Sequence, residues 1–339
     1  MNKKRVSIKD IAELAGVSHP TVSRALRGEG RMSDDTRARI LAIAADIGYT
    51  PSLIARGLVT QRSHSVGLAV TNFADPFHSE IAQGVEEEAQ RRQYSIYLAS
   101  TTVDPTRELE VVRNFQARRV DGLIVSSSRV GGQYAGLLQE IGIPIVLINT
   151  HAEGDNMHMV AHDDYGGALN LVQHLVDAGY RRIAFLGNQR GGKAVHERQR
   201  AWADALVQAG LPTEMLCFGP NGRFEGGVVG ARNLLTLAEE TWDSLPDALV
   251  CYNDTMAIGA ISVLRAQGLG VPGDMAVTGF DDVDVAAYFE PPLTTWRQPR
   301  RAMGRAAMTM MLELLDGETN GTHRHVHVMH GELVVRRSA

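Results

Sequence analysis

The sequence predicts a small all-helical head followed by a larger α/β body made of two parallel-sheet subdomains. The first 50 residues contain three short helical patterns with clear start and stop signals. From Ser65 onward, apolar runs alternate with stretches of helical period, which is typical of parallel sheets covered on both faces. These runs fall into two sets of about four, divided near residues 160–167. Two subdomains therefore fit the pattern better than one large sheet.

The first two helices of the head begin and end at residues that suit those positions. Ser7 and Asp10 form a capping-box-like start, and Gly16 ends the first helix. Ser18 can cap the second helix, whose first turn contains Pro20, where a missing N–H costs nothing.

The third helix and a linker complete the region before the body. The helix starts at Ser33, carries acidic residues at the positive end of its dipole and ends at Gly48. After Pro51 comes a short helical stretch that is weakened by Gly57 and Thr60. We expect this stretch to be disordered alone and helical only when two copies pack together over DNA; a passive tether is the alternative.

The body is predicted to contain eight strands separated by helical stretches. The strands are expected at residues 65–70, 95–100, 122–127, 144–149, 182–187, 215–219, 248–253 and 275–280. A helix over 300–316 and a strand-like stretch over 325–338 end the chain. The predicted domains are a head (1–50), a hinge (51–63) and a two-lobed body (64–339).

Charge and composition limit the possible partners. The net charge is -5, but residues 1–62 carry 11 Lys and Arg against 6 Asp and Glu, whereas the remainder carries 23 against 33. A basic head on an acidic body indicates an anionic partner for the head alone. The two cysteines, Cys217 and Cys251, lie in apolar runs, which predicts buried thiols and a reducing compartment. The N-terminus lacks a signal-peptide pattern and no 18-residue apolar run occurs, so we expect a cytoplasmic protein without membrane contact.

The second helix has more polar surface than burial would require. Only Val22, Ala25 and Leu26 form an apolar stripe, and the other faces carry hydroxyl, histidine and arginine side chains. Thr and Ser are short enough to reach base edges in the major groove, and Arg can bind guanine. The pattern therefore predicts a helix–turn–helix that binds DNA; a three-helix protein-interaction domain is the alternative.

Motifs along the whole chain resemble the lactose/galactose repressor (LacI/GalR) family. They include "IKDIAELAGVSHPTVSRALRG" and "GYTPSLIARGL" in the head and hinge, and "VDGLIV", "GIPIVLIN", "YNDTMAIGAISVLRAQGLGVPGDMAVTGFDD" and "PPLTTWRQP" in the body. The resemblance implies two flavodoxin-like subdomains, like those of periplasmic sugar-binding proteins, with a small effector in the cleft between them.

The resemblance also implies which residues contact DNA. In the head these are Ser18, His19, Pro20, Thr21, Ser23, Arg24, Arg27, Arg31, Ser33 and Thr36. In the hinge, Ala55 and Leu58 match the residues that enter the minor groove. Pro20 departs from the polar residue found at this position in the family, so the resemblance does not determine the base preference at that step.

Six residues of the body match the effector cleft of this family. They are Phe73 and Phe77, expected in the loop after the first strand, and Asp163, Arg198, Asn253 and Asp281. Charged and amide groups suit a polar ligand with vicinal hydroxyls or a carboxylate. The aromatic residue that the family has near position 222 is absent, because Gly222 stands there.

Two further motifs suggest other chemistry. Residues 187–194 read GxxxxGK, as in phosphate-binding loops, but Ala194 replaces the Ser or Thr that would hold Mg²⁺, so we interpret them as a loop of the effector cleft. His323, His325 and His327 alternate as metal ligands on a strand can, yet no ligand cluster accompanies them, and a solvated strand is expected. No nucleophile elbow surrounds the serines after residue 125.

These observations predict a ligand-responsive transcription factor that is not an enzyme and needs no cofactor or metal. The partners expected are operator DNA with two half-sites, a small effector and a second copy of the chain. A free sugar-binding protein and an α/β enzyme are the alternatives. The sequence leaves open whether the effector is a neutral sugar, a sugar acid or a phosphorylated sugar.

Overall fold

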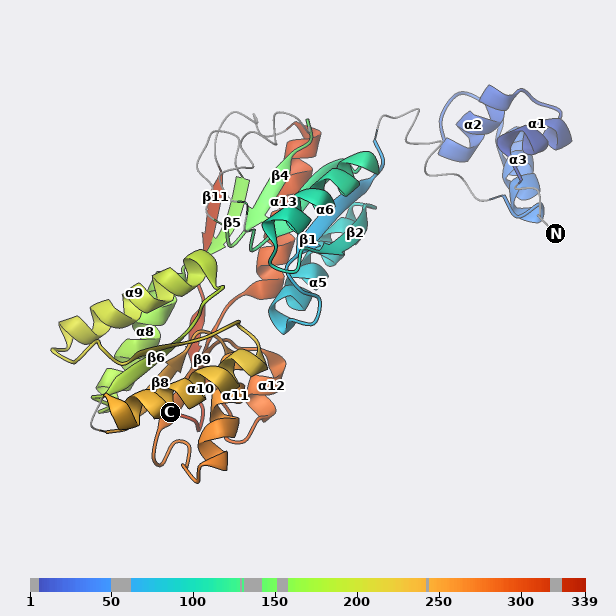
Figure 1. Cartoon of the computed structure of the whole chain (residues 1–339). Coiled ribbons are helices and arrows are strands. Elements are labelled where there is room, and N and C mark those ends of the chain that lie inside the picture. Colours follow the sequence, from blue (N-terminus) through green and yellow to red (C-terminus); the bar gives the residue numbers. More distant parts are fainter. Residues whose placement is uncertain are drawn as a thin grey trace. The chain divides into compact units, whose positions relative to one another are not determined.

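The computed structural model describes residues 6–49, 62–128, 130, 142–150, 158–241, 244–317 and 325–339. It divides into two compact units, residues 1–63 and residues 64–339, which we call the head and the body (Figure 1). Ala55, Leu58 and the rest of the predicted hinge helix lie outside the described residues, as does His323.

The head consists of three helices around a small core. These are α1 (Ile8–Ala15), α2 (His19–Arg27) and α3 (Asp34–Asp46). Ile11, Val22 and Ile40, one from each helix, are completely buried. The predicted helix starts are confirmed: the Asp10 carboxylate accepts the Ser7 N–H at 2.7 Å, and the Ser33 hydroxyl accepts a backbone N–H of α3. The short apolar stripe of α2 is therefore enough to pack the helix against α1 and α3, and its other faces are available to a partner.

The body contains two six-stranded sheets, one in each lobe. The N-lobe sheet has the order β11-β5-β4-β3-β1-β2, and the C-lobe sheet has the order β12-β10-β9-β8-β6-β7. The N-lobe strands are β1 (Ser65–Val70), β2 (Ser95–Ser100), β3 (Gly122–Ser126), β4 (Ile145–Ile148), β5 (His158–His162) and β11 (Val326–Met329). The C-lobe strands are β6 (Ile183–Asn188), β7 (Leu216–Gly219), β8 (Ala248–Cys251), β9 (Ala276–Asp281), β10 (Thr294–Arg297) and β12 (Glu332–Val334). All pairs are parallel except β10 with β12.

Helices cover both faces of each sheet (Figure 1). In the N-lobe they are α5 (Pro76–Arg91) and α13 (Arg300–Asp316) on one face and α6 (Pro105–Ala117) on the other. In the C-lobe they are α10 (Phe224–Glu240) and α11 (Asp254–Ala266) on one face and α8 (Asp164–Asp177) and α9 (Gly192–Gln208) on the other, with the short α12 (Asp284–Tyr288) after β9. This layering explains why the strands read as continuous apolar runs.

Strand β1 illustrates the packing on both faces. Val66, Leu68 and Val70 join the core under α5 and α13, whereas Ala69 joins the core under α6. Gly67 leaves no room for a side chain, because a Cβ there would lie 2.7 Å from the Phe115 ring.

The chain passes between the lobes three times. The crossings follow His162 at the end of β5, Arg297 at the end of β10 and Met329 at the end of β11. The sequence prediction of about four strands in each set is therefore too low, and the strand-like stretch 325–338 is two short strands in different sheets. The predicted division near residues 160–167 coincides with the first crossing.

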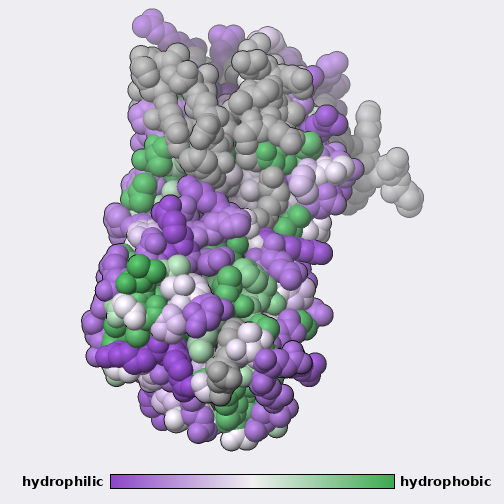
Figure 2. All heavy atoms as spheres, turned by 60° about the vertical axis from the view of Figure 1, so that its left-hand side comes forward, coloured by the Kyte–Doolittle hydropathy of each residue, from purple (hydrophilic) through white to green (hydrophobic). Residues whose placement is uncertain are grey.

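The body has a mainly hydrophilic surface and buried cysteine thiols. Figure 2 shows one face on which hydrophilic side chains cover most of the coloured surface and hydrophobic ones form small separate patches. Cys217 and Cys251 are buried and free, and burial raises the pKa of the Cys217 thiol to about 12. Among the described residues, no helix combines the length and apolar character that a bilayer crossing requires.

Candidate DNA-binding and effector sites

The predicted DNA contacts lie on one part of the head, from the start of α2 to the start of α3. Those exposed are Ser18, His19, Pro20, Arg24, Arg31 and Ser33, and those half-buried are Thr21, Ser23 and Thr36. The Arg27 side chain lies outside the described part of the chain. Hydroxyls at two helix starts already pair, Ser18 with Thr21 at 2.9 Å and Ser33 with Thr36 at 2.8 Å. Arg24 donates weakly to the Pro20 carbonyl at 3.3 Å, which lays it along α2.

Arg198 is held firmly by groups of its own chain. It projects from α9, is 4% exposed, and donates through Nε and Nη2 to Asp164 Oδ1 at 2.9 and 2.7 Å. Nη1 donates to the Tyr252 carbonyl at 2.6 Å, and the guanidinium lies 3.7 Å from the Phe280 ring centroid. Burial alone would raise the pKa of Asp164, but Arg198 and His162 hold that pKa below its ordinary value. Arg198 therefore organises the first crossing and the ends of two C-lobe strands.

Asn253 and Asp281 follow the strands whose ends Arg198 joins. Asn253 caps α11, accepting the Met256 N–H and donating to the Gly222 carbonyl, both at 2.9 Å. Asp281 accepts a 2.5 Å hydrogen bond from Gln298 at the second crossing. Together with Arg198 these residues form the polar cluster at the carboxyl ends of β8 and β9, as the strand order of a parallel sheet dictates.

A charged residue of the N-lobe also affects the polar cluster. Burial raises the pKa of Asp281 well above its ordinary value; Arg198 opposes this, and Asp254 and Asp75 add to it. Asp75 belongs to the N-lobe loop that caps α5, so charge from both lobes acts on the Asp281 carboxyl. Asp281 also has a φ of 117°, a strained left-handed conformation for a residue other than glycine.

The remaining predicted cleft residues are placed differently. Asp163 caps α8 by accepting the Gly166 N–H at 2.8 Å, and its other oxygen lies 3.5 Å from His330 Nδ1 at the third crossing. Phe77 is not in the loop after β1, as expected, but in the first turn of α5, where it is 8% exposed and packs in the N-lobe core. Phe77 is therefore a core residue and not a loop residue, because α5 already begins at Pro76.

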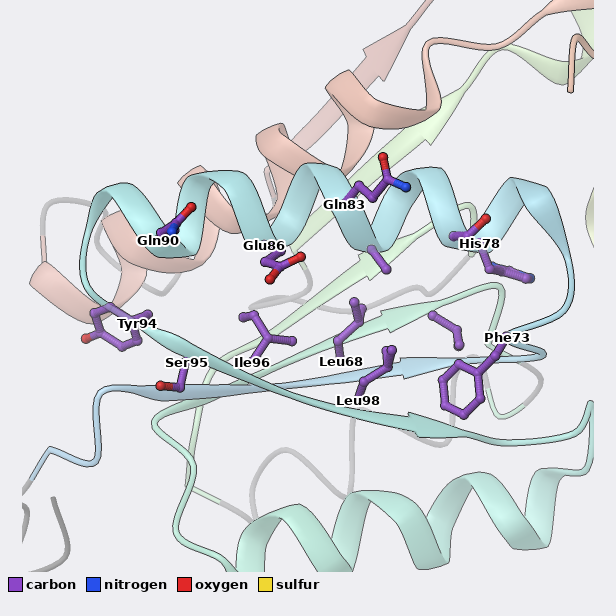
Figure 3. A pocket seen from close by; sticks show the side chains of 13 residues that line it. Leu68, Phe73, His78, Gln83, Glu86, Gln90, Tyr94, Ser95, Ile96 and Leu98 are labelled. Carbon is purple, nitrogen blue, oxygen red and sulfur yellow. The ribbon is translucent and has the colours of Figure 1, made fainter. Parts of the chain in front are cut away.

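Phe73 lines a cavity of about 660 Å³ whose described lining residues belong to the N-lobe. Leu68, Ile96 and Leu98 face α5 along this groove, and Phe73 stands at one end of it (Figure 3). The Phe73 side chain is half exposed. The described residues that line this groove all belong to the N-lobe, and the assignment of Phe73 to the effector cleft stays a prediction.

A second cavity, of about 680 Å³, lies between the lobes. Val103 and Pro105 line it from the N-lobe, and residues of the β6–α9 connection line it from the C-lobe. Asn188 joins this inter-lobe cavity to the polar cluster, because a Cβ on Gly222 would lie 2.8 Å from its Nδ2 and 3.5 Å from Asn253 Nδ2. A larger residue at 222 would displace both amides.

Several buried polar residues near the crossings were missed by the sequence reasoning. Asp254 is completely buried and accepts hydrogen bonds from Thr295 Oγ1 at 2.5 Å and the Val283 N–H at 2.7 Å. Asp282 pairs with Arg297 and Arg336, both at 2.7 Å. The only available signal was the run of acidic residues in "YND" and "GFDD", which does not reveal partners 15 or more residues away.

The histidine tail does not form a metal site with the residues that the structure describes. His325 precedes β11 and His327 lies on it, and both are exposed. His158 on β5 stacks on His325, and burial together with His325 lowers the pKa of His158. Within the described ranges, no three His, Cys, Asp or Glu side chains group as a metal site would require.

Comparison with known proteins agrees with both parts of this architecture. A family model described as bacterial regulatory proteins, lacI family, matches residues 7–52, and one described as periplasmic binding protein-like domain matches residues 172–339. The chain is 30% identical over 335 residues to the HTH-type transcriptional repressor PurR of Photobacterium profundum, covering 98% of each protein.

Two solved structures share nearly the whole chain. The transcriptional regulator CelR in complex with cellobiose has 30% identity and a TM-score of 0.74, covering 99% of this chain and 100% of that one. The Lac repressor dimer bound to operator and the anti-inducer ONPF has 25% identity and a TM-score of 0.86, covering 99% of both chains.

Proposed function

Because the chain belongs to the lacI family of bacterial regulatory proteins and is a DNA-binding regulator of transcription, we propose that a small sugar, sugar acid or sugar phosphate sets its affinity for operator DNA. The effector binds at the polar cluster and the adjoining inter-lobe cavity. The observation that carries this proposal is the convergence of Arg198, Asn253 and Asp281 beside a cavity that both lobes line. Buried carboxyl and amide groups at such a place suit vicinal hydroxyls.

In the proposed complex α2 is the recognition helix. Its polar side chains enter the major groove, and the arginines and hydroxyls around it contact bases and phosphates. Ala55 and Leu58 are proposed to contact the minor groove between two half-sites. An operator partner implies a cytoplasmic location.

A dimer follows from two half-sites, and the N-lobe groove is the proposed contact face. Tyr97 and Leu98 on the edge strand β2 are 45% and 47% exposed, and Leu98 lines the groove together with Phe73. An exposed apolar edge strand invites pairing with another chain, and a second copy would cover it. The relative with the solved operator complex is a dimer.

Effector binding is coupled to DNA through the three crossings. A ligand that contacts both lobes favours one lobe arrangement by its differential affinity, about 1–3 kcal/mol in typical cases. Asp163, Gln298 and His330 lie at the crossings: Gln298 donates to Asp281 of the polar cluster, and His330 lies near Asp163. We propose that their hydrogen bonds change when the lobes close, so that the spacing of the two heads changes.

A thermal-shift screen with neutral sugars, sugar acids and sugar phosphates, with and without operator DNA, tests this function. A ligand at 100 times its Kd adds about 2.7 kcal/mol to the stability of the folded body. Asp281→Asn should abolish the response, whereas Asp284→Asn, an exposed carboxylate on α12, should keep it. Binding by both variants equal to that of the wild type would show that the polar cluster is not the effector site.

A further inference from the structure

The turn after α2 brings the backbone back beside Arg24, which is proposed to contact a base. Gly28 ends the helix with a φ of 73° and donates its N–H to the Ala25 carbonyl at 3.1 Å. The Glu29 N–H reaches back to the Arg24 carbonyl at 3.0 Å. These two hydrogen bonds form a Schellman-type end, which fixes the direction of the chain after the helix. Gly30 then takes a second left-handed conformation, with a φ of 80°.

The Arg24 side chain lies directly against Gly30. A Cβ at Gly30 would lie 3.0 Å from Arg24 Cδ, 3.7 Å from its Cβ and 3.8 Å from its Cγ, so the alkyl stem runs along the turn. Arg24 Nε donates to the Pro20 carbonyl at 3.3 Å, which is a long hydrogen bond. The direction of the Arg24 guanidinium therefore depends mainly on where Gly30 lies.

Arg37 on α3 holds this turn in place. Its Nη2 donates to the Gly30 carbonyl at 3.3 Å, and its Nη1 would lie 3.7 Å from a Cβ on Gly28. Arg37 is half-buried, and its Nε is shielded from solvent without an acceptor among the described residues. A shielded N–H without an acceptor destabilises a fold. The guanidinium is thus packed against both glycines of the turn, although full solvation would favour its Nε.

A second arginine of α3 makes a comparable contact at the other end of α2. Arg39 Nη2 donates to the carbonyl of Ala15, the last residue of α1, at 3.0 Å. Helix α3 therefore holds the segment before α2 through Arg39 and the segment after it through Arg37. Of these two contacts, that of Arg37 is made with the residue on which Arg24 lies. The two arginines share a helix, a charge and a type of acceptor, which makes them a matched pair for experiment.

We propose that Arg37 is a positioning residue for DNA recognition. By holding the Gly30 carbonyl it fixes the turn on which Arg24 lies, and so directs the Arg24 guanidinium toward its base edge. This rests on the proposed recognition role of α2 and adds to it a residue that acts through Arg24. A side chain that its neighbours already hold in the bound conformation loses less entropy on binding. Loss of Arg37 should therefore lower the affinity for the preferred sequence more than the affinity for random DNA.

The first experiment compares two DNAs by fluorescence anisotropy at fixed salt with the full-length protein: a site selected from random DNA by the wild type, and a random duplex of equal length. Arg37→Met should weaken binding to the selected site about tenfold and to random DNA about twofold, because a base contact is impaired and one charge is lost. Arg37→Lys keeps the charge and a donor and should recover part of the loss. Arg39→Met should weaken binding to both DNAs equally. Equal losses on both DNAs for Arg37→Met, or no loss, overturn the proposal.

The second experiment tests whether Arg37 acts through Arg24. In an Arg24→Ala background, Arg37→Met should have no further effect on the selected site, because the side chain that it positions is gone. A further loss as large as in the wild-type background would overturn the proposal. If Arg24→Ala weakens binding to the selected site and Arg37→Met does not, this inference fails while the role of Arg24 stands. If Arg24→Ala binds the selected site like the wild type, the proposed role of Arg24 fails and this inference fails with it.

A pair of glycine variants tests the same path without removing a charge. Gly30→Ala puts a methyl group against the Arg24 stem, whereas Gly48→Ala, at a similar φ of 66°, meets no described atom within 4 Å. Both variants carry the strain of a left-handed alanine, so the difference between them reports the contact with Arg24. Gly30→Ala should bind the selected site about fivefold more weakly than Gly48→Ala, with random DNA bound alike. Equal affinities of the two variants for the selected site would show that Gly30 does not direct Arg24.

Discussion

At the scale of single residues, the buried carboxyl groups of the C-lobe show how neighbouring groups set a pKa. Asp254 is completely buried, and burial raises its pKa to about 6, although the Thr295 hydroxyl and the Val283 N–H lower it. Asp164 behaves oppositely, because Arg198 lies against it and holds its pKa below the ordinary value despite burial. The pKa values of two aspartates in one lobe are therefore shifted in opposite directions, because Asp164 has a cationic partner in direct contact and Asp254 does not.

The raised pKa of Asp254 predicts a pH dependence of stability. The folded protein holds this proton more tightly than the unfolded chain, whose pKa is near 3.8, so the contribution is present at acidic pH and is lost as pH rises from about 4 to about 6. The loss is on the order of 3 kcal/mol at about 1.4 kcal/mol per pKa unit. Asp254→Asn should remove this component, which urea unfolding of both proteins between pH 4.5 and 7 would reveal.

The matched control for this experiment is Asp284→Asn, which changes an exposed carboxylate of the same lobe. Its stability should follow the wild-type pH curve. Parallel curves for the wild type and Asp254→Asn across the whole range would contradict the assignment.

At the scale of elements, α2 packs against the rest of the head through few buried side chains, and most of its surface stays accessible. Val22 and Ala25 are buried, while most of the remaining residues are exposed or half-buried. Gly30 in the following turn has a φ of 80°, and a Cβ there would lie 3.0 Å from the Arg24 side chain. The turn after α2 thus leaves room for the stem of Arg24.

Replacing Arg24 should therefore affect DNA binding and not folding. Arg24→Ala is expected to weaken binding to a site selected from random DNA by the wild-type protein by about 1–3 kcal/mol, if Arg24 binds a base edge. Fluorescence anisotropy at fixed salt measures this, and Arg232→Ala in the body serves as the control. An equal loss on random DNA would assign Arg24 to a phosphate, and no loss at all would exclude it from the interface.

At the scale of the whole molecule, the two lobes and the edge of the N-lobe determine assembly. Strand β2 is the outermost strand of its sheet and keeps large apolar side chains exposed, whereas the opposite edge strand, β11, is shorter. A second copy on the β2 edge would give an assembly with two heads, and two linked heads bind two half-sites far more tightly than one.

Leu98→Asp should disrupt this assembly. A buried unpaired charge at the contact face is expected to yield monomers in analytical ultracentrifugation, and operator affinity should fall at least about 100-fold because the heads are no longer linked. Val207→Asp, which changes an exposed residue of α9 in the other lobe, should leave both properties intact. A dimer that persists in Leu98→Asp would place the contact face elsewhere.

The sequence by itself determined the local elements and part of the site. Caps at Ser7 and Ser33 marked helix starts, and apolar runs located the strands of both sheets, because capping and periodicity act within a few residues. Asn253 and Asp281 could also be grouped, since parallel strands bring their carboxyl ends to one edge, whereas Arg198 was assigned to the same site by the family resemblance.

Only the tertiary structure decided what depends on contacts between distant segments. Strand β11 pairs with β5, so that Val326 lies opposite Met159, and no local sequence pattern predicts this pairing. The pairing of Arg198 with Asp164, the burial of Asp254 and the cavity between Pro105 and Arg190 likewise depend on contacts between segments far apart in the sequence. Local propensity determines which residues can form an element, but pKa shifts and cavities depend on which elements come into contact.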